Sequence, residues 1–224
     1  MKDKETGLTR ATSVYDSIRR DIMGGEIRPG ERLLFDALRE RYACGISPLR
    51  EALNRLYSEG WVAQEEQRGF RAAETSEDEL RQLVETRVLV EGAAIAAALK
   101  RRDEAAEEHL VLAFHRLRKA HRLVDGRRSE AWERLHKAFH VALVAGAGLP
   151  RATAFCSQLF DVAERYRILC AAHYPERNER DEHAQILEAY LDGDADRTVA
   201  LLSAHYTVTL NMILAAGPEN RRAD

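Results

Sequence analysis

The spacing of apolar residues divides the chain into two regions. In residues 13–60, apolar side chains recur at intervals of three and four in three short runs, which is typical of amphipathic helices. Glycine and proline mark the turns between the runs, among them Ile27-Arg-Pro-Gly30. We predict a first helix that begins at Ser13 and ends at Gly24-Gly25, a second that contains Leu33, Leu34, Leu38 and Tyr42, and a third that is capped by Ser47 and ends at Glu59-Gly60.

Residues 61–73 have a different pattern, with two short extended runs on either side of Gln67-Arg68-Gly69. Such a pattern predicts a two-stranded hairpin. Three helices followed by a hairpin form a winged helix-turn-helix, whose third helix enters the major groove of DNA while the wing reaches the backbone or the minor groove. The residues predicted to contact DNA are Ser47, Arg50, Asn54 and Arg55 on the third helix and Arg68 and Gly69 on the wing. The alternative is that these arginines form an ordinary solvated face.

From Glu77 onward the apolar period is helical in block after block. Helices are predicted near 77–100, 103–124, 129–146, 150–172, 178–192 and 194–216, with breaks at Asp125-Gly126, Gly146 to Pro150, Pro175 and Asp192-Gly193. The fold class is therefore mainly α, with a helical bundle of six or seven helices after the winged module. The expected organisation is a disordered tail over 1–12, a DNA-binding domain over 13–75, a helical domain over 76–216 and a flexible tail over 217–224.

Composition and charge narrow the classes of function. The chain has 224 residues, a net charge of −3 and equal numbers of basic and acidic residues before residue 76, so attraction to DNA must come from local placement of arginines. Three scattered cysteines exclude a disulfide framework and a thiolate metal site. No apolar run approaches a membrane span and the first residues are charged, so we expect a cytoplasmic protein with no membrane partner.

Four of the eight histidines stand out by their spacing. His136 and His140 lie four residues apart and share one face of a predicted helix, and His183 and His205 lie on the last two helices. If those helices are antiparallel neighbours, the four imidazoles converge on one metal. A lone histidine is more often a surface or core residue than a ligand. A catalytic metal is the alternative to a sensing one, but no His-Glu-x-x-His motif supplies a general base.

Several motifs in the first region resemble the DNA-binding domain of GntR-family bacterial transcription regulators. They are Gly24-Gly-Glu-Ile-Arg-Pro-Gly30, Ser47-Pro-Leu-Arg-Glu-Ala-Leu53, Glu59-Gly-Trp-Val and Arg68-Gly-Phe-Arg71. The resemblance implies that Arg50 and Gly69 contact operator DNA. The chain departs from the family at Gly45-Ile46, where many members have Ser-Arg, and at Asp36, where an arginine is frequent. The operator sequence therefore does not transfer.

The second region resembles the ligand-sensing domain, called FCD, that is found in the FadR-like branch of the GntR family. The motifs are Leu135-His-Lys-Ala-Phe-His-Val-Ala-Leu143, Glu182-His-Ala-Gln-Ile-Leu-Glu-Ala-Tyr190, Gly193-Asp-Ala195 and the late His205. The resemblance implies a divalent metal held by three histidines and an aspartate or asparagine. His140, His183 and His205 match the histidines, and His136 stands at the carboxylate or amide position. Zinc is the expected metal, with nickel or iron as alternatives. His136 either binds the metal or hydrogen-bonds an effector.

Together these features predict a ligand-responsive repressor that is not an enzyme. It would bind double-stranded DNA at a palindromic operator as a homodimer, because one short recognition helix reads few bases. The effector would be a small organic acid, held by the metal and by a buried arginine, either Arg87 or one of Arg165 and Arg167. The predicted effector-binding residues are Arg87, Arg165 and Tyr166. A salt bridge from Arg87 to Glu91 is an equally good explanation of Arg87. The alternatives are a metal-dependent enzyme acting on a small carboxylate and a direct sensor of the metal ion.

Overall fold

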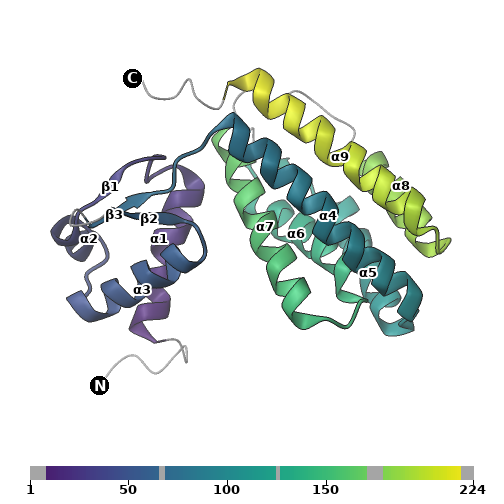
Figure 1. Ribbon diagram of the computed structural model, residues 1–224, viewed down its shortest axis with the longest axis horizontal. Helices are drawn as coiled ribbons and strands as arrows, with labels where there is room; N and C mark the ends of the chain where they lie inside the picture. The colour runs from purple at the N-terminus through teal and green to yellow at the C-terminus, as the bar shows by residue number, and fades with distance from the viewer. Residues whose placement is uncertain (1–8, 66–68, 125–126, 171–178, 218–224) are drawn as a thin grey trace. The chain divides into compact units, whose positions relative to one another are not determined.

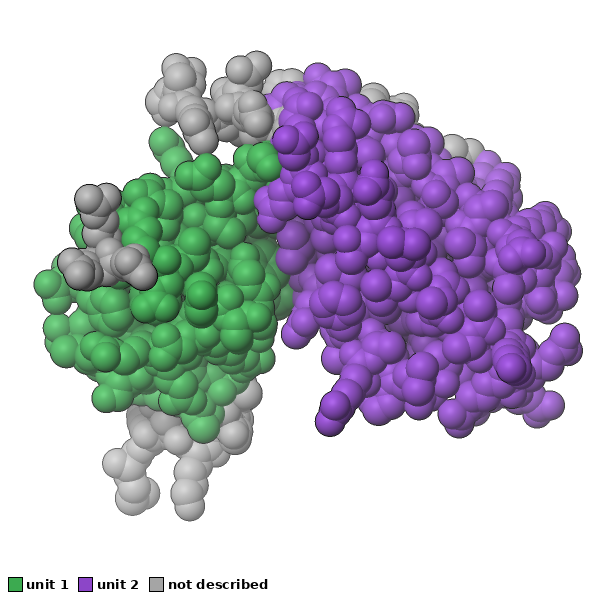
Figure 2. All heavy atoms as spheres, in the orientation of Figure 1, with its two compact units in different colours: residues 1–76, 164–172, 218–224 green, residues 77–163, 173–217 purple. Residues whose placement is uncertain are grey.

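A computed structural model describes residues 9–65, 69–124, 127–170 and 179–217. The chain forms two compact units, one of residues 1–76, 164–172 and 218–224 and the other of residues 77–163 and 173–217 (Figures 1 and 2). Within the described ranges the first unit has three helices and a small sheet at its N-terminal end, and six helices follow. The mainly helical fold predicted from the sequence is confirmed. Residues 1–8 of the predicted N-terminal tail and residues 218–224 of the predicted C-terminal tail lie outside the described residues.

The N-terminal unit is a winged helix-turn-helix. Its helices are α1 (Arg10–Gly24), α2 (Phe35–Arg41) and α3 (Ile46–Ser58), and α1 packs against α3. The apolar faces of the three helices pack against one another in one core, because this arrangement removes all three faces from water. The side chains that the core buries completely are those of Ile18, Ile22, Leu49, Leu53, Leu56 and Ala72.

The first helix begins earlier than predicted. Thr9 is its N-cap and accepts a hydrogen bond from the Thr12 backbone N–H, so α1 starts at Arg10 and not at Ser13. Ala11 is buried, which ties this first turn to the core. Residues 10–12 therefore belong to the folded unit and not to the predicted tail. The apolar pattern did not reveal this turn because it contributes a single small buried side chain.

The second helix begins later than predicted, because Arg32–Leu33 is a strand, β1. Gly30 has a left-handed φ of 72°, as the Pro-Gly turn predicted, and the chain leaves that turn extended. Arg32 and Leu34 are exposed on either side of the buried Leu33, the alternation that an extended chain gives. Leu34 is the extended N-cap of α2. The prediction of Leu33 and Leu34 within a helix was wrong, because two adjacent leucines fit either period.

The wing has three strands and not two. β2 (Val62–Glu65) and β3 (Gly69–Ala72) form the predicted hairpin, and β1 pairs with the other edge of β3 in the order β1-β3-β2. All pairs are antiparallel, with Leu33 and Gln64 both opposite Phe70. β1 was missed because its two residues pair with a strand almost forty positions later, a contact that local pattern does not encode.

The third helix is also capped differently. Gly45 is the N-cap of α3 and offers no side-chain hydrogen bond, while Ser47 and Pro48 lie inside the first turn. Proline is tolerated there because the first N–H groups of a helix have no intrahelical acceptor. Ser47 was predicted to be the N-cap of α3, and that prediction was wrong. Its hydroxyl is exposed and can contact a molecule bound at this end of the helix.

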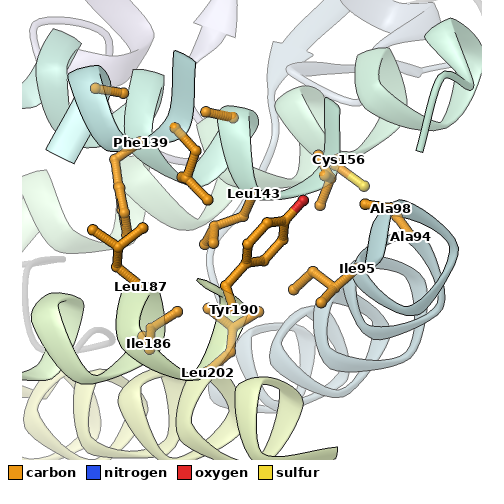
Figure 3. Close-up of a cluster of buried hydrophobic side chains, with 14 of the residues drawn as sticks. Ala94, Ile95, Ala98, Phe139, Leu143, Cys156, Ile186, Leu187, Tyr190 and Leu202 are labelled. Atoms are coloured by element: carbon orange, nitrogen blue, oxygen red, sulfur yellow. The ribbon is translucent and has the colours of Figure 1, made fainter. Parts of the chain in front are cut away.

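The second unit is an all-helical bundle, as predicted. Its helices are α4 (Glu77–Arg101), α5 (Glu104–Lys119), α6 (Glu130–Ala145), α7 (Pro150–Leu169), α8 (Glu179–Leu191) and α9 (Ala195–Ala216), although α7 passes into the first unit at residue 164. Figure 3 shows the core, where Phe139 and Leu143 of α6 meet Ile186, Leu187 and Tyr190 of α8. Ile95 of α4 and Leu202 of α9 close it. The bundle therefore brings α4, α6, α8 and α9 around one interior.

The predicted helix over 103–124 ends at Lys119. Leu123–Val124 forms a short strand, β4, that pairs antiparallel with β5, Arg127–Arg128. Both Leu123 and Val124 are more than half exposed, so they give a helix no apolar face to bury. The predicted break at Asp125-Gly126, like that at Pro175, lies outside the described residues.

The last helix, α9, is by length and composition apolar enough to cross a membrane. Its most apolar 18-residue window has a mean hydropathy of 1.5, and 22% of that window is buried within the chain. Such a helix is weak evidence for a membrane span, since core helices pass the same test. α9 also carries two buried polar side chains, His205 and Thr198, toward the bundle interior.

Candidate metal centre and DNA-binding face

Four buried histidines meet inside the helical unit. His136 and His140 come from α6, His183 from α8 and His205 from α9, and each is at most 5% exposed. One nitrogen from each ring lies within 4.8 Å of one nitrogen from each of the others. The structure therefore brings together all four histidines that the sequence singled out.

The spacing of these nitrogens fits a metal ion. Nε2 of His140 lies 3.0 Å from Nε2 of His136 and 3.3 Å from Nε2 of His183. Imidazoles bound tetrahedrally to a metal at about 2.0–2.1 Å have nitrogens roughly 3.3 Å apart. The donor set also fits chemically, because imidazole suits zinc, copper, iron and nickel.

Hydrogen bonds behind two of the rings set the tautomer that a metal requires. Nδ1 of His205 donates to Oε2 of Glu182 at 2.8 Å, so its Nε2 carries the lone pair. Nδ1 of His140 lies 3.2 Å from the hydroxyl of Tyr206. Since that hydroxyl donates to Oε2 of Glu91 at 2.5 Å, it accepts from His140. Both rings thus present an unprotonated Nε2, the form that binds a metal.

The Tyr206 hydroxyl belongs to a buried network that continues to Arg87. Arg87 donates from Nη2 to this hydroxyl at 2.6 Å and from Nε to Glu91 at 2.7 Å, and its guanidinium carbon lies 3.9 Å from the centroid of the Tyr206 ring. Burial raises the pKa of Tyr206 well above its usual range, with smaller effects from Arg87 and Glu91. The hydroxyl therefore stays protonated and can keep donating to Glu91.

Aromatic rings hold the remaining face of the cluster. Trp132 lies one turn before His136 and stacks on it, with centroids 4.6 Å apart and planes 18° apart. Phe160 meets the ring of His136 edge to face at 5.3 Å. These contacts restrict the rotation of His136 and exclude water, which strengthens any interaction between the imidazoles and an ion.

The three predicted effector residues occupy two different places. Arg87 lies in the network beside His140, and its predicted salt bridge to Glu91 is present with both side chains buried. Arg165 and Tyr166 lie in the part of α7 that belongs to the first unit. There Arg165 donates to the carbonyl of Ala73 at 2.7 Å, and the Tyr166 hydroxyl accepts from the N–H of Ser76 at 3.3 Å. Arg87 is therefore joined to the histidines, whereas the other two hold the backbone of residues 73–76.

One exposed face of α3 carries three of the six predicted DNA-contact residues. Ser47, Arg50 and Asn54 are exposed and line one surface depression together with Ile46 and Glu51. Among the described residues Arg50 has no ion-pair partner. Exposed hydrogen-bonding side chains on a recognition helix are the groups that read base edges in the major groove.

Arg55 lies on another side of α3. Its Nε donates to Glu59 at 3.1 Å, and its guanidinium lies 3.7 Å from the centroid of the Tyr15 ring in α1. Tyr15 donates to Glu59 at 2.5 Å, and burial together with that hydrogen bond raises its pKa to about 12. Arg55 therefore links α3 to α1 within the folded unit. On the wing, Gly69 has a φ of 89°, and Arg68 lies outside the described residues.

Several site residues were not found from the sequence. Tyr206, Glu182 and Trp132 all support histidines, yet none belongs to a pattern that distinguishes it from an ordinary core or surface residue. Two of them are sequence neighbours of the clustered histidines: Tyr206 follows His205 and Glu182 precedes His183. That adjacency was the one available signal.

Comparison with known proteins identifies the family. The profile of the gntR family of bacterial regulatory proteins matches residues 10–71, and the profile of the FCD domain matches residues 82–208. The chain is 31% identical over 208 residues to the HTH-type transcriptional repressor GlaR of Escherichia coli (strain K12), which covers 90% of this chain and 94% of GlaR. The chain belongs to the GntR family of bacterial regulatory proteins. Within that family it carries an FCD domain.

Other members have the same extent and fold. The uncharacterised regulator BphR of Paraburkholderia xenovorans (strain LB400) is 31% identical over 213 residues, covering 92% of this chain and 85% of BphR. The structure of E. coli McbR/YncC has a TM-score of 0.74 at 19% identity and covers 93% of this chain and 98% of that one. A putative GntR regulator from Rhodococcus sp. RHA1 has a TM-score of 0.72 at 21% identity, with coverage of 93% and 99%. This GntR-family protein is thus a bacterial transcriptional regulator and not an enzyme.

Proposed function

We propose that this GntR-family regulator is a repressor whose FCD domain binds a divalent metal at the four histidines and, through that metal, a small organic acid. The observation that carries the proposal is the convergence of four buried imidazole nitrogens within 4.8 Å of one another. Each ring can direct one nitrogen toward the same centre, and imidazole nitrogen is a ligand that zinc, nickel and iron accept. One metal ion can therefore bind all four.

His136 distinguishes this centre from the family pattern that the sequence resembles. A carboxylate at that position would cancel one positive charge of the ion, whereas four neutral imidazoles cancel none. The bound metal would therefore supply a localised double positive charge in a site closed by Trp132 and Phe160. An anionic ligand is favoured at such a centre, because attraction is strong where water is excluded. This supports a carboxylate-bearing effector, with zinc as the first candidate for the metal and nickel or iron next.

Arg87 is the residue through which an effector would act on the network. An arriving carboxylate competes with Glu91 for the guanidinium, because both are planar bidentate acceptors. Glu91 also accepts from Tyr206 through its other oxygen, so a shift of this carboxylate away from Arg87 would change the bond to Tyr206 and, through Tyr206, the contact with His140. Effector binding would thus change the orientation of α4 and α9 around the centre.

On the DNA side, we place the regulator in the bacterial cytoplasm as a homodimer on a palindromic operator. Three members of the predicted set, Ser47, Arg50 and Asn54, share one exposed depression on α3, which is few contacts for a specific site, so a second copy is needed. Repression is supported by similarity to a relative named as a repressor.

The proposal is tested with fragments of the protein's own promoter region. Fluorescence anisotropy is measured at fixed salt with metal-loaded protein, with protein treated with a chelator, and with metal-loaded protein plus a panel of mono-, di- and hydroxycarboxylic acids. We expect binding to a palindromic fragment that one class of acid weakens only when metal is present. Metal content is measured by mass spectrometry in each sample.

Two outcomes would contradict the proposal. If the folded protein takes up no divalent metal, the proposed metal centre does not exist. If acids weaken DNA binding equally after the metal has been removed with a chelator, the metal has no part in effector binding. A change in DNA affinity with metal alone, and no response to any acid, would instead make the ion itself the signal.

A further inference from the structure

Ile46 is an exposed apolar side chain on the face of α3 that carries predicted DNA contacts. It is the first residue of the helix, it is 52% exposed, and the core of the N-terminal unit does not include it. Ile46 lies four and eight residues before Arg50 and Asn54, so the three side chains share one side of the helix. Of the described residues that line the depression on this side, all except Ile46 are polar. Packing within the chain therefore does not explain an isoleucine at this position.

The backbone that carries Ile46 is held in place by buried neighbours. Two residues earlier, Cys44 is buried and its N–H donates to the carbonyl of Arg39 at 3.2 Å. Three residues later, Leu49 is completely buried in the core beneath α3. An isoleucine in a helix also has one strongly preferred χ1 rotamer. The methyl groups of Ile46 therefore project from the start of α3 in a direction that the fold defines.

The neighbouring side chains indicate what this face binds. Ser47, Arg50 and Asn54 are exposed and make no side-chain hydrogen bond or ion pair within the described part of the chain. Such groups hydrogen-bond to base edges in the major groove. In a helix-turn-helix regulator the N-terminal residues of the recognition helix contact those edges, and Ile46 begins that helix. Ile46 is therefore placed to meet a base pair.

Thymine is the base whose major-groove edge carries an apolar group, its C5-methyl. Guanine, adenine and cytosine present hydrogen-bond donors and acceptors there, with which an isoleucine side chain forms no hydrogen bond. Contact between the isoleucine and the methyl group removes apolar surface of both from water. We propose that Ile46 reads one thymine in each half of the operator through the C5-methyl group of that base.

The spacing along α3 places this thymine relative to the base that Arg50 contacts. Four residues of helix rise about 6 Å, and successive bases of one strand are about 3.4 Å apart along the duplex. The two contacts therefore fall within about two base steps of each other. Arginine in the major groove pairs most often with guanine. The expected half-site has a thymine about two steps from a guanine. The two half-sites rest on the proposed homodimer, whereas the thymine contact rests on Ile46.

The first test removes the methyl group from the DNA and leaves the protein unchanged. The metal-loaded protein first selects a palindromic operator from random duplex DNA, and each thymine is then replaced by uracil in both half-sites. Uracil pairs as thymine does and lacks only the C5-methyl. At one position affinity should fall about four-fold for each methyl group removed, or about fifteen-fold for both half-sites, measured by fluorescence anisotropy at fixed salt. The other thymines of the operator are the controls.

The second test determines whether this loss depends on Ile46. Ile46→Ala should bind the thymine operator as weakly as the unmodified chain binds the uracil operator, and uracil at that position should weaken its binding no further. Leu123→Ala is the control, because Leu123 is a similarly exposed aliphatic residue, at 57%, in β4 of the other unit. It should keep the full response to uracil. Circular dichroism and metal content report that both variants are folded.

The third test places the methyl group on a different base. Cytosine in place of the thymine should weaken binding of the unmodified chain. 5-Methylcytosine should restore part of that affinity, because its methyl group lies at the same place in the groove. Ile46→Ala should bind the operators with cytosine and with 5-methylcytosine equally.

The results that would overturn the thymine contact differ from those that would overturn the proposed function. Binding that uracil weakens at no position, or a methyl effect that persists in Ile46→Ala, would exclude the contact. If Ile46→Ala weakens binding equally with thymine and with uracil, the side chain packs against sugar and phosphate and does not read a base. A chain that gives any of these results on a selected palindromic operator keeps its proposed function. A chain that selects no DNA sequence would overturn both.

Discussion

The hydroxyl of Tyr206 lies 3.2 Å from Nδ1 of His140 and donates its own hydrogen to Glu91. Tyr206→Phe keeps the ring and removes this acceptor, so His140 loses the bond that fixes its tautomer. We expect metal affinity to be about 10–100-fold weaker, the usual effect of removing the hydrogen bond to the second ring nitrogen of a histidine that binds a metal. Competition with a chromophoric chelator measures it.

Tyr190→Phe is the control for that substitution, since Tyr190 is an equally buried tyrosine of the same unit on α8. It should bind metal as the unmodified chain does. Equal losses in both variants would mean that Tyr206 acts only through general packing.

His136→Asp is expected to change which metal the centre prefers. The substitution adds a negative charge and a hard oxygen donor, which favour manganese and iron relative to nickel and zinc. The ratio of the manganese and nickel dissociation constants should move toward manganese on the order of ten-fold, about 1.4 kcal/mol. Isothermal titration calorimetry gives both constants. The control for the added charge is His109→Asp, at an exposed histidine on α5. If the ratio of the two dissociation constants did not change in His136→Asp, His136 would be excluded as a metal ligand.

Arg50→Ala and His183→Ala should separate the two activities. Arg50 is exposed on α3, and its loss should weaken operator binding by roughly 1–3 kcal/mol while metal content is unaffected. His183 is 1% exposed within the cluster, and its loss should lower metal affinity. In the absence of effector and at fixed salt, the His183 variant should retain affinity for the operator. Arg151→Ala on α7 removes an exposed charge from another surface and serves as the control for Arg50. If both test variants lost both activities, the assignment of DNA and metal to separate units would fail.

Cys156 should resist alkylation in the folded protein. Burial raises the pKa of its thiol to about 11, so at pH 8 only about one molecule in a thousand carries the reactive thiolate. The rate of labelling by iodoacetamide, followed by peptide mass spectrometry, should rise about ten-fold per pH unit from 8 to 10 while the fold is intact. Unfolding in guanidinium should make it fast at pH 8. Rapid labelling of the native chain at pH 8 would show that the interior opens.

The sequence predicted the parts of the fold that depend on local pattern. All six helices of the bundle were expected, and five of them begin and end within three residues of the prediction. His136 and His140 were found because their spacing repeats the helical period, and His183 and His205 because they lie on the last two predicted helices within motifs of the FCD domain. Part of what the sequence did not predict depends on contacts distant in the chain, since β1 exists because Leu33 lies opposite Phe70. β4 is different, because it pairs with β5 only three to five residues later, a local pairing that was missed when residues 103–124 were taken as one helix.

The same limit applies to the candidate site. Arg50 and Arg55 look alike in sequence, and only the packing of α1 against α3 shows that Arg55 stacks on Tyr15. Arg87 was ambiguous between an effector and Glu91, and the fold adds Tyr206, a partner 119 residues away. A hydrogen-bond network inside a bundle depends on how helices face one another, which no single helix records.

The helix α9 has a mechanical consequence. His205 and Tyr206 point into the bundle, and Ala204 and Val208 lie on the outer surface of the same two turns. A hydrogen-bonded helix is stiff over so short a length, so any rotation of α9 about its axis that moves His205 turns Ala204 and Val208 through the same angle. A change at the histidine cluster that rotates α9 therefore also changes the outer surface of that helix.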